Sequence, residues 1–243
     1  MTTNTASRGA DKLMATTELV TDVRLAVLDM AGTTVADDGL VLRAFEAAAA
    51  AVGLPADTEE RAKAQQYVID TMGQSKIEVF RAIFGGEDVA QQANVAFEQA
   101  YETAIDDGIA PIAGAAEAVT ELREAGLVVA LTTGFSSSTQ QRILRALGWQ
   151  DIADIVLAPG DGGRGRPHPD LVLNALQRAE INDVTEVAVI GDTANDIVSG
   201  RRAGASILAG VLTGAHDEAA LRAAGATHVL GSVAELPALL LRS

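Results

Sequence analysis

The sequence predicts an α/β fold, with a doubly wound parallel sheet and an all-helical cap domain inserted after the first strand. Short apolar runs alternate with amphipathic patterns of helical period, as in parallel strands joined by crossover helices. Between residues 40 and 108 this alternation stops and only helical patterns remain. Several apolar runs end in polar residues, and in such sheets ligands bind where the strands end.

The first strand is expected at residues 25–28, a continuous apolar run typical of a strand buried on both faces. Asp29 follows it, and then come a glycine and two threonines. An aspartate at the end of a strand contributes nothing to the core. Asp29 is therefore either a solvated turn residue or a functional one, and the residues that converge on it decide between the two.

The helical insert is expected to contain four helices, at about residues 40–52, 57–72, 75–84 and 88–105. Gly53 and Pro55 end the first helix, since neither residue favours its continuation. Asp57 and Ser75, each followed by a glutamate three residues later, resemble capping boxes that start the second and third helices. An insert of this length is within the usual size of a small domain.

The alternation of strands and helices resumes at Pro111. Ser138 with Gln141 resembles a cap at the start of one of these helices. Strands are expected at about 127–131, 155–157, 187–190, 207–212 and 227–230, and helices at about 114–125, 138–147, 169–179, 194–203, 218–224 and from 233. The predicted organisation is a loose tail at 1–19, a core domain at 20–39 and 109–243, and the cap domain at 40–108.

The composition excludes several classes of function. With a formal net charge of −15, the chain is unsuited to hold nucleic acid or an anionic membrane surface by general charge. It has no cysteine, and no apolar run reaches transmembrane length. Its first residues are polar and lack the apolar segment of a signal peptide. We expect a cytoplasmic protein that binds an anionic substrate through a metal ion or a few local cations.

Polar groups suited to phosphoryl chemistry follow four of the expected strands: Asp29, then Thr133 and Gly134, then Arg166, then Asp192 and Asp196. Aspartate oxygens are ligands that Mg²⁺ prefers. A threonine hydroxyl, backbone N–H groups and an arginine can neutralise phosphoryl oxygens. Asp29 can attack phosphorus and form an aspartyl-phosphate.

These motifs resemble the haloacid dehalogenase superfamily over residues 23–230: Asp29-x-x-Gly32-Thr33, then Thr133-Gly134, then a basic residue, then Gly191-Asp192-x-x-x-Asp196. The resemblance implies that Asp29 is the nucleophile. It also implies that Mg²⁺ is held by Asp29, Asp192, Asp196 and the backbone carbonyl of Ala31. The phosphoryl group would contact Gly32, Thr33, Thr133, Gly134 and Arg166. Thr33 and Thr193 are also placed to orient the two neighbouring aspartates.

Two departures point to one branch of that superfamily. Ala31 stands where most phosphatases of the superfamily carry a second aspartate, and Arg166 stands in place of the usual lysine. Both features resemble the phosphonatase branch, that is, phosphonoacetaldehyde hydrolase and its close relatives. Those enzymes cleave a C–P bond and form a Schiff base between a cap lysine and the aldehyde of the substrate.

The segment from Met72 and Gly73 to Lys76 resembles the lysine motif of that branch, and the resemblance implies that Met72 and Gly73 contact the substrate. In the first turn of a helix, the helix dipole and partial burial favour the neutral amine that imine formation needs. The chain contains only three lysines, Lys12, Lys63 and Lys76, so a lysine at this position favours a functional role over an exposed one.

Val79 departs from the branch, whose members tend to carry a histidine three residues after the lysine, and this leaves the substrate open. The expected reaction is the Mg²⁺-dependent cleavage of a 2-oxoalkylphosphonate. The alternatives are a phosphate-monoester hydrolase, which Ala31 disfavours because an alkoxide leaving group needs a nearby acid, and a non-catalytic phosphate-binding module. A dehalogenase would not need the pair Asp192 and Asp196. The resemblance also implies that the cap can support a homodimer.

Overall fold

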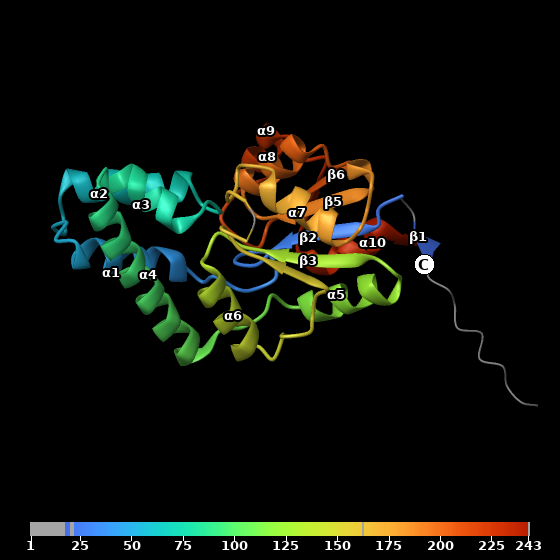
Figure 1. Ribbon diagram of the computed structural model, residues 1–243, viewed down its shortest axis with the longest axis horizontal. Helices are drawn as coiled ribbons and strands as arrows, with labels where there is room; N and C mark the ends of the chain where they lie inside the picture. The colour runs from blue at the N-terminus through green and yellow to red at the C-terminus, as the bar shows by residue number, and fades with distance from the viewer. Residues whose placement is uncertain (1–17, 20–21, 162, 243) are drawn as a thin grey trace, which may run out of the picture.

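A six-stranded parallel sheet forms the centre of the protein (Figure 1). The computed structural model describes residues 18–19, 22–161 and 163–242 of the chain. The strands lie in the order β4 (Ile155–Leu157), β3 (Val128–Thr132), β2 (Leu25–Asp29), β5 (Val187–Gly191), β6 (Ile207–Val211) and β7 (His228–Leu230). The chain adds β3 and β4 on one side of β2 and the later strands on the other. The sheet is therefore doubly wound, and the predicted fold class is confirmed.

Strand β2 pairs in parallel with both β3 and β5, and all five of its residues are buried. Ala26 and Leu28 belong to the hydrophobic core on one face of the sheet, whereas Leu25 and Val27 belong to the core on the other face. Successive side chains of a strand point to opposite faces, so a strand covered on both sides consists of apolar residues throughout. Asp29 is the last residue of this strand and lies at the carboxyl end of the sheet.

Helices cover both faces of the sheet (Figure 1). One layer contains α5 (Ala115–Glu124), α6 (Ser137–Ala146) and α10 (Leu236–Leu240), and the other contains α7 (Asp170–Arg178), α8 (Ala194–Ala203) and α9 (Glu218–Ala224). Short 3-10 helices at Val184–Glu186 and Val233–Glu235 precede β5 and α10. All the crossover connections expected from the sequence are thus present.

The insert consists of α1 (Leu40–Ala51), α2 (Glu59–Asp70), α3 (Lys76–Phe84) and α4 (Glu87–Gly108), at the left of Figure 1. Aromatic side chains fill its interior, with the ring centroids of Phe80 and Phe97 5.7 Å apart. The ring of Tyr101 on α4 lies 4.5 Å from the ring of Phe135, which follows β3. The aromatic cluster therefore continues from the insert to the carboxyl end of the sheet, next to β3.

The entry and exit segments of the insert lie side by side. Val35 forms an antiparallel bridge with Pro111, and the backbone N–H of Ala36 donates to the carbonyl of Ala110 at 2.9 Å. The two connections thus form a short paired ribbon beneath the insert. The domain limits at 20–39, 40–108 and 109–243 stay a prediction.

Part of the predicted tail is ordered by strand pairing. Strand β1 (Glu18–Leu19) pairs antiparallel with β8 (Leu241–Arg242), so these two residues of the predicted tail belong to a small second sheet. The pairing depends on a partner more than 200 residues away, which local pattern does not reveal. Residues 1–17 of the predicted tail lie outside the described part of the chain.

The predicted helix caps are wrong in detail. Thr58, not Asp57, caps α2, because its hydroxyl accepts a backbone N–H bond at 3.2 Å. Ser75 precedes α3 as expected, but its side chain makes no capping bond. Ser136 rather than Ser138 caps α6. The sequence offers several short polar residues at each helix start, and the path of the preceding loop decides which of them caps the helix.

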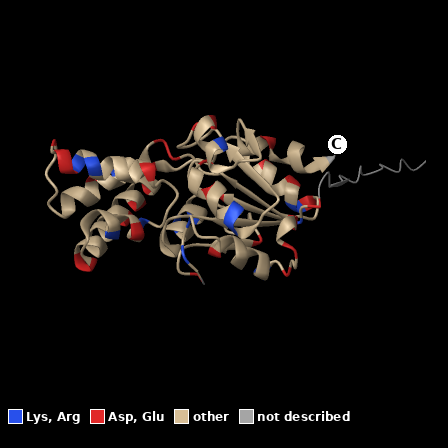
Figure 2. Cartoon of the chain, turned by 90° about the horizontal axis from the view of Figure 1, so that it is seen from above, with Lys and Arg blue, Asp and Glu red and all other residues tan. Residues whose placement is uncertain are grey.

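Along the backbone, Lys and Arg positions are interspersed with Asp and Glu positions (Figure 2). Among the described residues, no helix is both long and apolar enough to span a lipid bilayer.

Candidate active site

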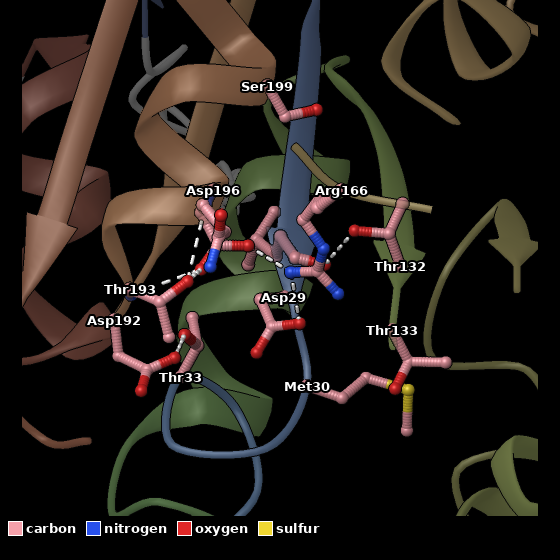
Figure 3. Close-up of polar contacts among 12 residues, drawn as sticks. Asp29, Met30, Thr33, Thr132, Thr133, Arg166, Asp192, Thr193, Asp196 and Ser199 are labelled. Carbon is pink, nitrogen blue, oxygen red and sulfur yellow. Dashed lines mark hydrogen bonds and ion pairs between the residues drawn. The ribbon is translucent and has the colours of Figure 1, made fainter. Parts of the chain in front are cut away.

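Three buried carboxylates meet at the carboxyl end of the sheet (Figure 3). Asp29 ends β2, Asp192 follows the adjacent strand β5, and Asp196 lies in the first turn of α8. One oxygen of each lies within 4.8 Å of the others. The parallel pairing of β2 with β5 brings together residues that are more than 160 positions apart.

Threonine hydroxyls hold the loops that carry these acids. Thr33 donates to Oδ1 of Asp192 at 3.1 Å, and Thr34 donates to the carbonyl of Asp29 at 3.0 Å. Thr193 forms a reciprocal capping box with Asp196 at the start of α8. The sequence predicted that Thr33 orients Asp29 and that Thr193 orients Asp192, but Thr33 bonds Asp192 and Thr193 bonds Asp196. A phosphoryl contact of Thr33 stays a prediction.

Arg166 lies between two of the carboxylates (Figure 3). Its Nη1 donates to Oδ1 of Asp29 and to Oδ1 of Asp196. Its Nε and Nη2 are buried and find no hydrogen-bond partner among the described residues. The sequence predicted a phosphoryl contact for Arg166, whereas this arrangement makes it first a partner of the nucleophile. The phosphoryl contact stays a prediction.

The loop before α3 packs directly on the core. The side-chain amide of Asn195 donates to the backbone carbonyl of Met72 at 2.7 Å. The side-chain amide of Gln74 donates to the side-chain oxygen Oδ1 of Asn195 at 3.3 Å. The backbone N–H of Lys76 donates to the carbonyl of Gly134 at 3.1 Å. Neither Gln74 nor Asn195 was singled out from the sequence, because only their contact across the two parts of the molecule gives them a role.

Gly134 permits this close approach, since a Cβ atom there would overlap the backbone carbonyl of Gln74. Gly134→Ala is expected to lower kcat/KM by on the order of 100-fold, because small displacements of a catalytic group have effects of that size. Steady-state kinetics test this. Gly86→Ala is the matched control, because a Cβ there meets no atom within 4 Å. Equal losses in the two variants, or no loss in either, would contradict the expectation.

Lys76 reaches the same site from the insert. It is only 8% exposed, and its Nζ lies 5.4 Å from the ring centroid of Phe135. Burial lowers the pKa of Lys76 to about 8, although the charge of Asp37 opposes the shift. Lys76, Asp29, Asp192 and Thr133 line one cavity of about 440 Å³. The structure thus brings the predicted lysine to the predicted nucleophile.

The remaining predicted residues lie at the same place. Ala31, Gly32, Gly73 and Met72 line the cavity together with Gly134. Thr133 is buried, and its Oγ1 accepts the N–H of Phe135 at 3.2 Å. Val79 is buried in the hydrophobic core and does not appear among the described residues that line the cavity.

A family model described as haloacid dehalogenase-like hydrolase matches residues 23–204. The chain belongs to the haloacid dehalogenase-like hydrolase family. The resemblance inferred from the motifs is therefore confirmed. A phosphonoacetaldehyde hydrolase of Bacteroides fragilis is 27% identical over 256 residues, covering 90% of this chain and 95% of that protein.

Solved structures of other proteins share the fold. A phosphonoacetaldehyde hydrolase-like protein from Oleispira antarctica superposes with a TM-score of 0.78 at 22% identity, over 91% of this chain and 92% of that one. A predicted phosphoglycolate phosphatase from Haemophilus somnus gives 0.75 at 18% identity, over 90% and 99%. At these identities the likeness concerns the fold alone.

The acid cluster of this hydrolase fits a divalent cation, which members of the family generally use. Burial raises the pKa of Asp29; Arg166 opposes this shift, and Asp196 adds to it. Burial likewise raises the pKa of Asp192, and the nearby charges of Asp29 and Asp196 add to the effect. Arg166 pairs with only two of the three buried carboxylates, Asp29 and Asp196, so a bound cation would relieve the remaining repulsion. An all-oxygen donor set suits Mg²⁺.

Mg²⁺ is expected to raise the melting temperature of the hydrolase by about 5–10 °C at 100 times its dissociation constant. Asp192→Asn should remove most of that rise, because it takes away a charged ligand. Differential scanning calorimetry with and without Mg²⁺ measures the effect. Asp151→Asn, an exposed position, is the control and should keep the full rise. A rise of the same size in both variants would exclude Asp192 from the metal site.

The loop after β6 also contributes to the site, which the sequence analysis did not recognise. The backbone N–H of Ala215 donates to Oδ2 of Asp192 at 2.7 Å, and Thr213 donates to the carbonyl of Gly32 at 2.7 Å. A Cβ on Gly214 would overlap the carboxylate of Asp192. The available signal was a Thr-Gly pair at the end of an apolar run, the same pattern that identified Thr133 and Gly134.

Proposed function

We propose that the protein is a Mg²⁺-dependent phosphonatase-like hydrolase that cleaves the C–P bond of a 2-oxoalkylphosphonate. The observation that carries this proposal is Lys76, a buried amine with a lowered pKa in the same cavity as the candidate nucleophile Asp29. A buried lysine opposite a phosphoryl site suits a substrate with a carbonyl group beside its phosphonate. The name of the Bacteroides fragilis relative supports the same chemistry.

In the first step, the neutral amine of Lys76 attacks the substrate carbonyl to give a carbinolamine. The carbinolamine takes up a proton from solvent and loses water, which leaves a protonated imine. Asp29 then attacks phosphorus through its carboxylate. The C–P bond breaks, and its electron pair moves into the imine to give an enamine. Arg166 holds Oδ1 of Asp29 during this step, which fixes the direction of attack.

Water completes the reaction. It hydrolyses the aspartyl-phosphate to release inorganic phosphate and restore Asp29. The enamine takes up a proton, and water hydrolyses the resulting imine to release the carbonyl product and free Lys76. In total, one substrate and one water give one phosphate and one aldehyde or ketone.

The metal ion would be held by Asp29, Asp192, Asp196 and the carbonyl of Ala31. When bound, Mg²⁺ acts as a Lewis acid for the phosphoryl oxygens. Thr133 and Gly134 line the cavity, and the Thr133 hydroxyl and the backbone N–H of Gly134 would bind those oxygens. Gly32 also lines the cavity, but its backbone N–H already donates to the carbonyl of Val35 at 2.7 Å. The closed loop before α3 would exclude bulk water while the imine is present.

The decisive experiment measures phosphate release from phosphonoacetaldehyde with Mg²⁺, with and without borohydride. We expect turnover that borohydride abolishes, and a reduced covalent adduct on Lys76 detected by peptide mass spectrometry. Phosphoglycolate and p-nitrophenyl phosphate are assayed in parallel. Release of phosphate from these esters alone, unaffected by borohydride, would overturn the proposal and favour the monoesterase.

The rate of imine formation should increase with pH up to about 8 and then level off. The pKa of Lys76 in the folded protein is lowered to about 8, so below that pH the reactive neutral amine becomes tenfold scarcer with each pH unit. The pH dependence of borohydride trapping at low substrate concentration measures this. A flat profile, or an inflection near the ordinary lysine pKa, would contradict the assignment of Lys76 as the amine that forms the imine.

A further inference from the structure

The cavity beside Lys76 is larger than the smallest possible substrate requires. Its volume is about 440 Å³. Phosphonoacetaldehyde has seven non-hydrogen atoms, which fill roughly 200 Å³ if each takes the volume of a liquid water molecule, about 30 Å³. A hydrated metal ion would occupy some of the remainder. Space is left for several more non-hydrogen atoms.

That extra space has an apolar wall, which the insert provides. Val41 and Leu42 come from the first turn of α1, and Ile69 and Met72 come from the end of α2 and the loop after it. Val41 is buried, Leu42 and Met72 are half-buried, and Ile69 is 38% exposed. Apolar side chains at a cavity wall favour an apolar part of the ligand.

The charges of the cavity oppose an anionic substituent at this place. Asp37 and Asp38 line it beside Val41, whose N–H donates to Oδ1 of Asp37 at 3.3 Å. Among the described residues that line the cavity, Lys76 is the only cation. The protonated imine keeps the charge of Lys76, but no second cationic side chain among the described lining residues can pair with a further anionic group.

We propose that the natural substrate is a ketone, a 2-oxoalkylphosphonate with a neutral alkyl substituent of about three to five carbons on its carbonyl carbon. The phosphonate end would lie at Asp29, and the alkyl substituent would lie against the wall formed by Val41, Leu42, Ile69 and Met72. This inference rests on the proposed function, and it names the class of substrate for the same site.

The test compares ketones that differ only in this substituent. Initial rates are measured for 2-oxopropylphosphonate, with a methyl group, and 2-oxohexylphosphonate, with a butyl group. We expect kcat/KM to be at least about 10-fold higher for the butyl ketone, since each buried methylene contributes about fourfold. Phosphonopyruvate, with a carboxylate in the same place, should react at least about 10-fold less well than the methyl ketone.

Two variants and one control variant link these preferences to the residues. Leu42→Ala should lower the butyl-to-methyl ratio at least about fivefold, whereas Leu173→Ala, an exposed apolar residue on α7, should keep it. Asp38→Asn should lower the ratio of kcat/KM for the methyl ketone to kcat/KM for phosphonopyruvate. A butyl-to-methyl ratio that is the same in the wild-type protein, Leu42→Ala and Leu173→Ala would overturn the assignment of the wall.

The outcomes separate this inference from the proposed function. If no phosphonate releases phosphate while simple esters do, the proposed C–P cleavage itself is wrong. If C–P cleavage occurs but the methyl ketone or phosphonopyruvate is preferred, the proposed function stands and the inference about the substituent is overturned.

Discussion

Asp29→Asn is expected to lower kcat for phosphate release by at least about 10⁴-fold, as removal of a covalent nucleophile does in other hydrolases. The amide has the same shape but cannot attack phosphorus at a useful rate. Burial already disfavours the charge of Asp29, so the neutral amide should be accommodated without unfolding. Phosphate release is measured at saturating substrate, with a thermal melt to confirm the fold.

Asp151→Asn is the control for this variant, because it changes the same kind of side chain at an exposed position. It should keep wild-type activity. If Asp29→Asn is fully folded and loses less than about 10-fold in kcat, another residue must be the nucleophile.

Lys76→Arg is expected to abolish C–P cleavage, with a loss of at least about 1000-fold, and to abolish borohydride trapping. Arginine retains a positive charge but does not lose its proton in proteins, so it cannot form the imine. Without the imine, the carbon leaving phosphorus has no electron sink. Product formation is followed by a coupled assay for the aldehyde or ketone, and the adduct is followed by mass spectrometry.

Lys63→Arg is the matched control, since Lys63 lies on α2 of the same insert and forms an exposed ion pair with Glu59. This variant should retain activity and trapping. Substantial turnover of phosphonates by Lys76→Arg would show that Lys76 acts only through its charge. The cleavage would then require a different electron sink.

The centre of the site was accessible from the sequence because strand-end residues are fixed by topology. Once residues 25–28 and 187–190 are recognised as parallel strands, the loops that follow them must share one edge of the sheet. Lys76 was found differently, through a motif resemblance and the position of a helix start. In both cases a local pattern sufficed, and the fold brought the patterns together.

Other features of the site depend on contacts that no local pattern shows. The bond from Ala215 to Asp192 uses a backbone N–H, which any residue type can supply. The bonds of Asn195 with the loop before α3 exist only because the insert lies against the core. The place of Arg166 beside Asp29 and Asp196 does not follow from the sequence, because its long side chain can reach several groups.

The paired ribbon at Val35 and Pro111 has a consequence for how such a protein can change. The insert leaves and re-enters the sheet at adjacent points, so it can be exchanged as a cassette without altering any strand. The core around the sheet carries the three acids of the proposed phosphoryl transfer, while the cassette carries Lys76 and the apolar wall. Grafting this cassette onto a related core is therefore a direct way to move substrate choice between enzymes while leaving the transfer chemistry in place.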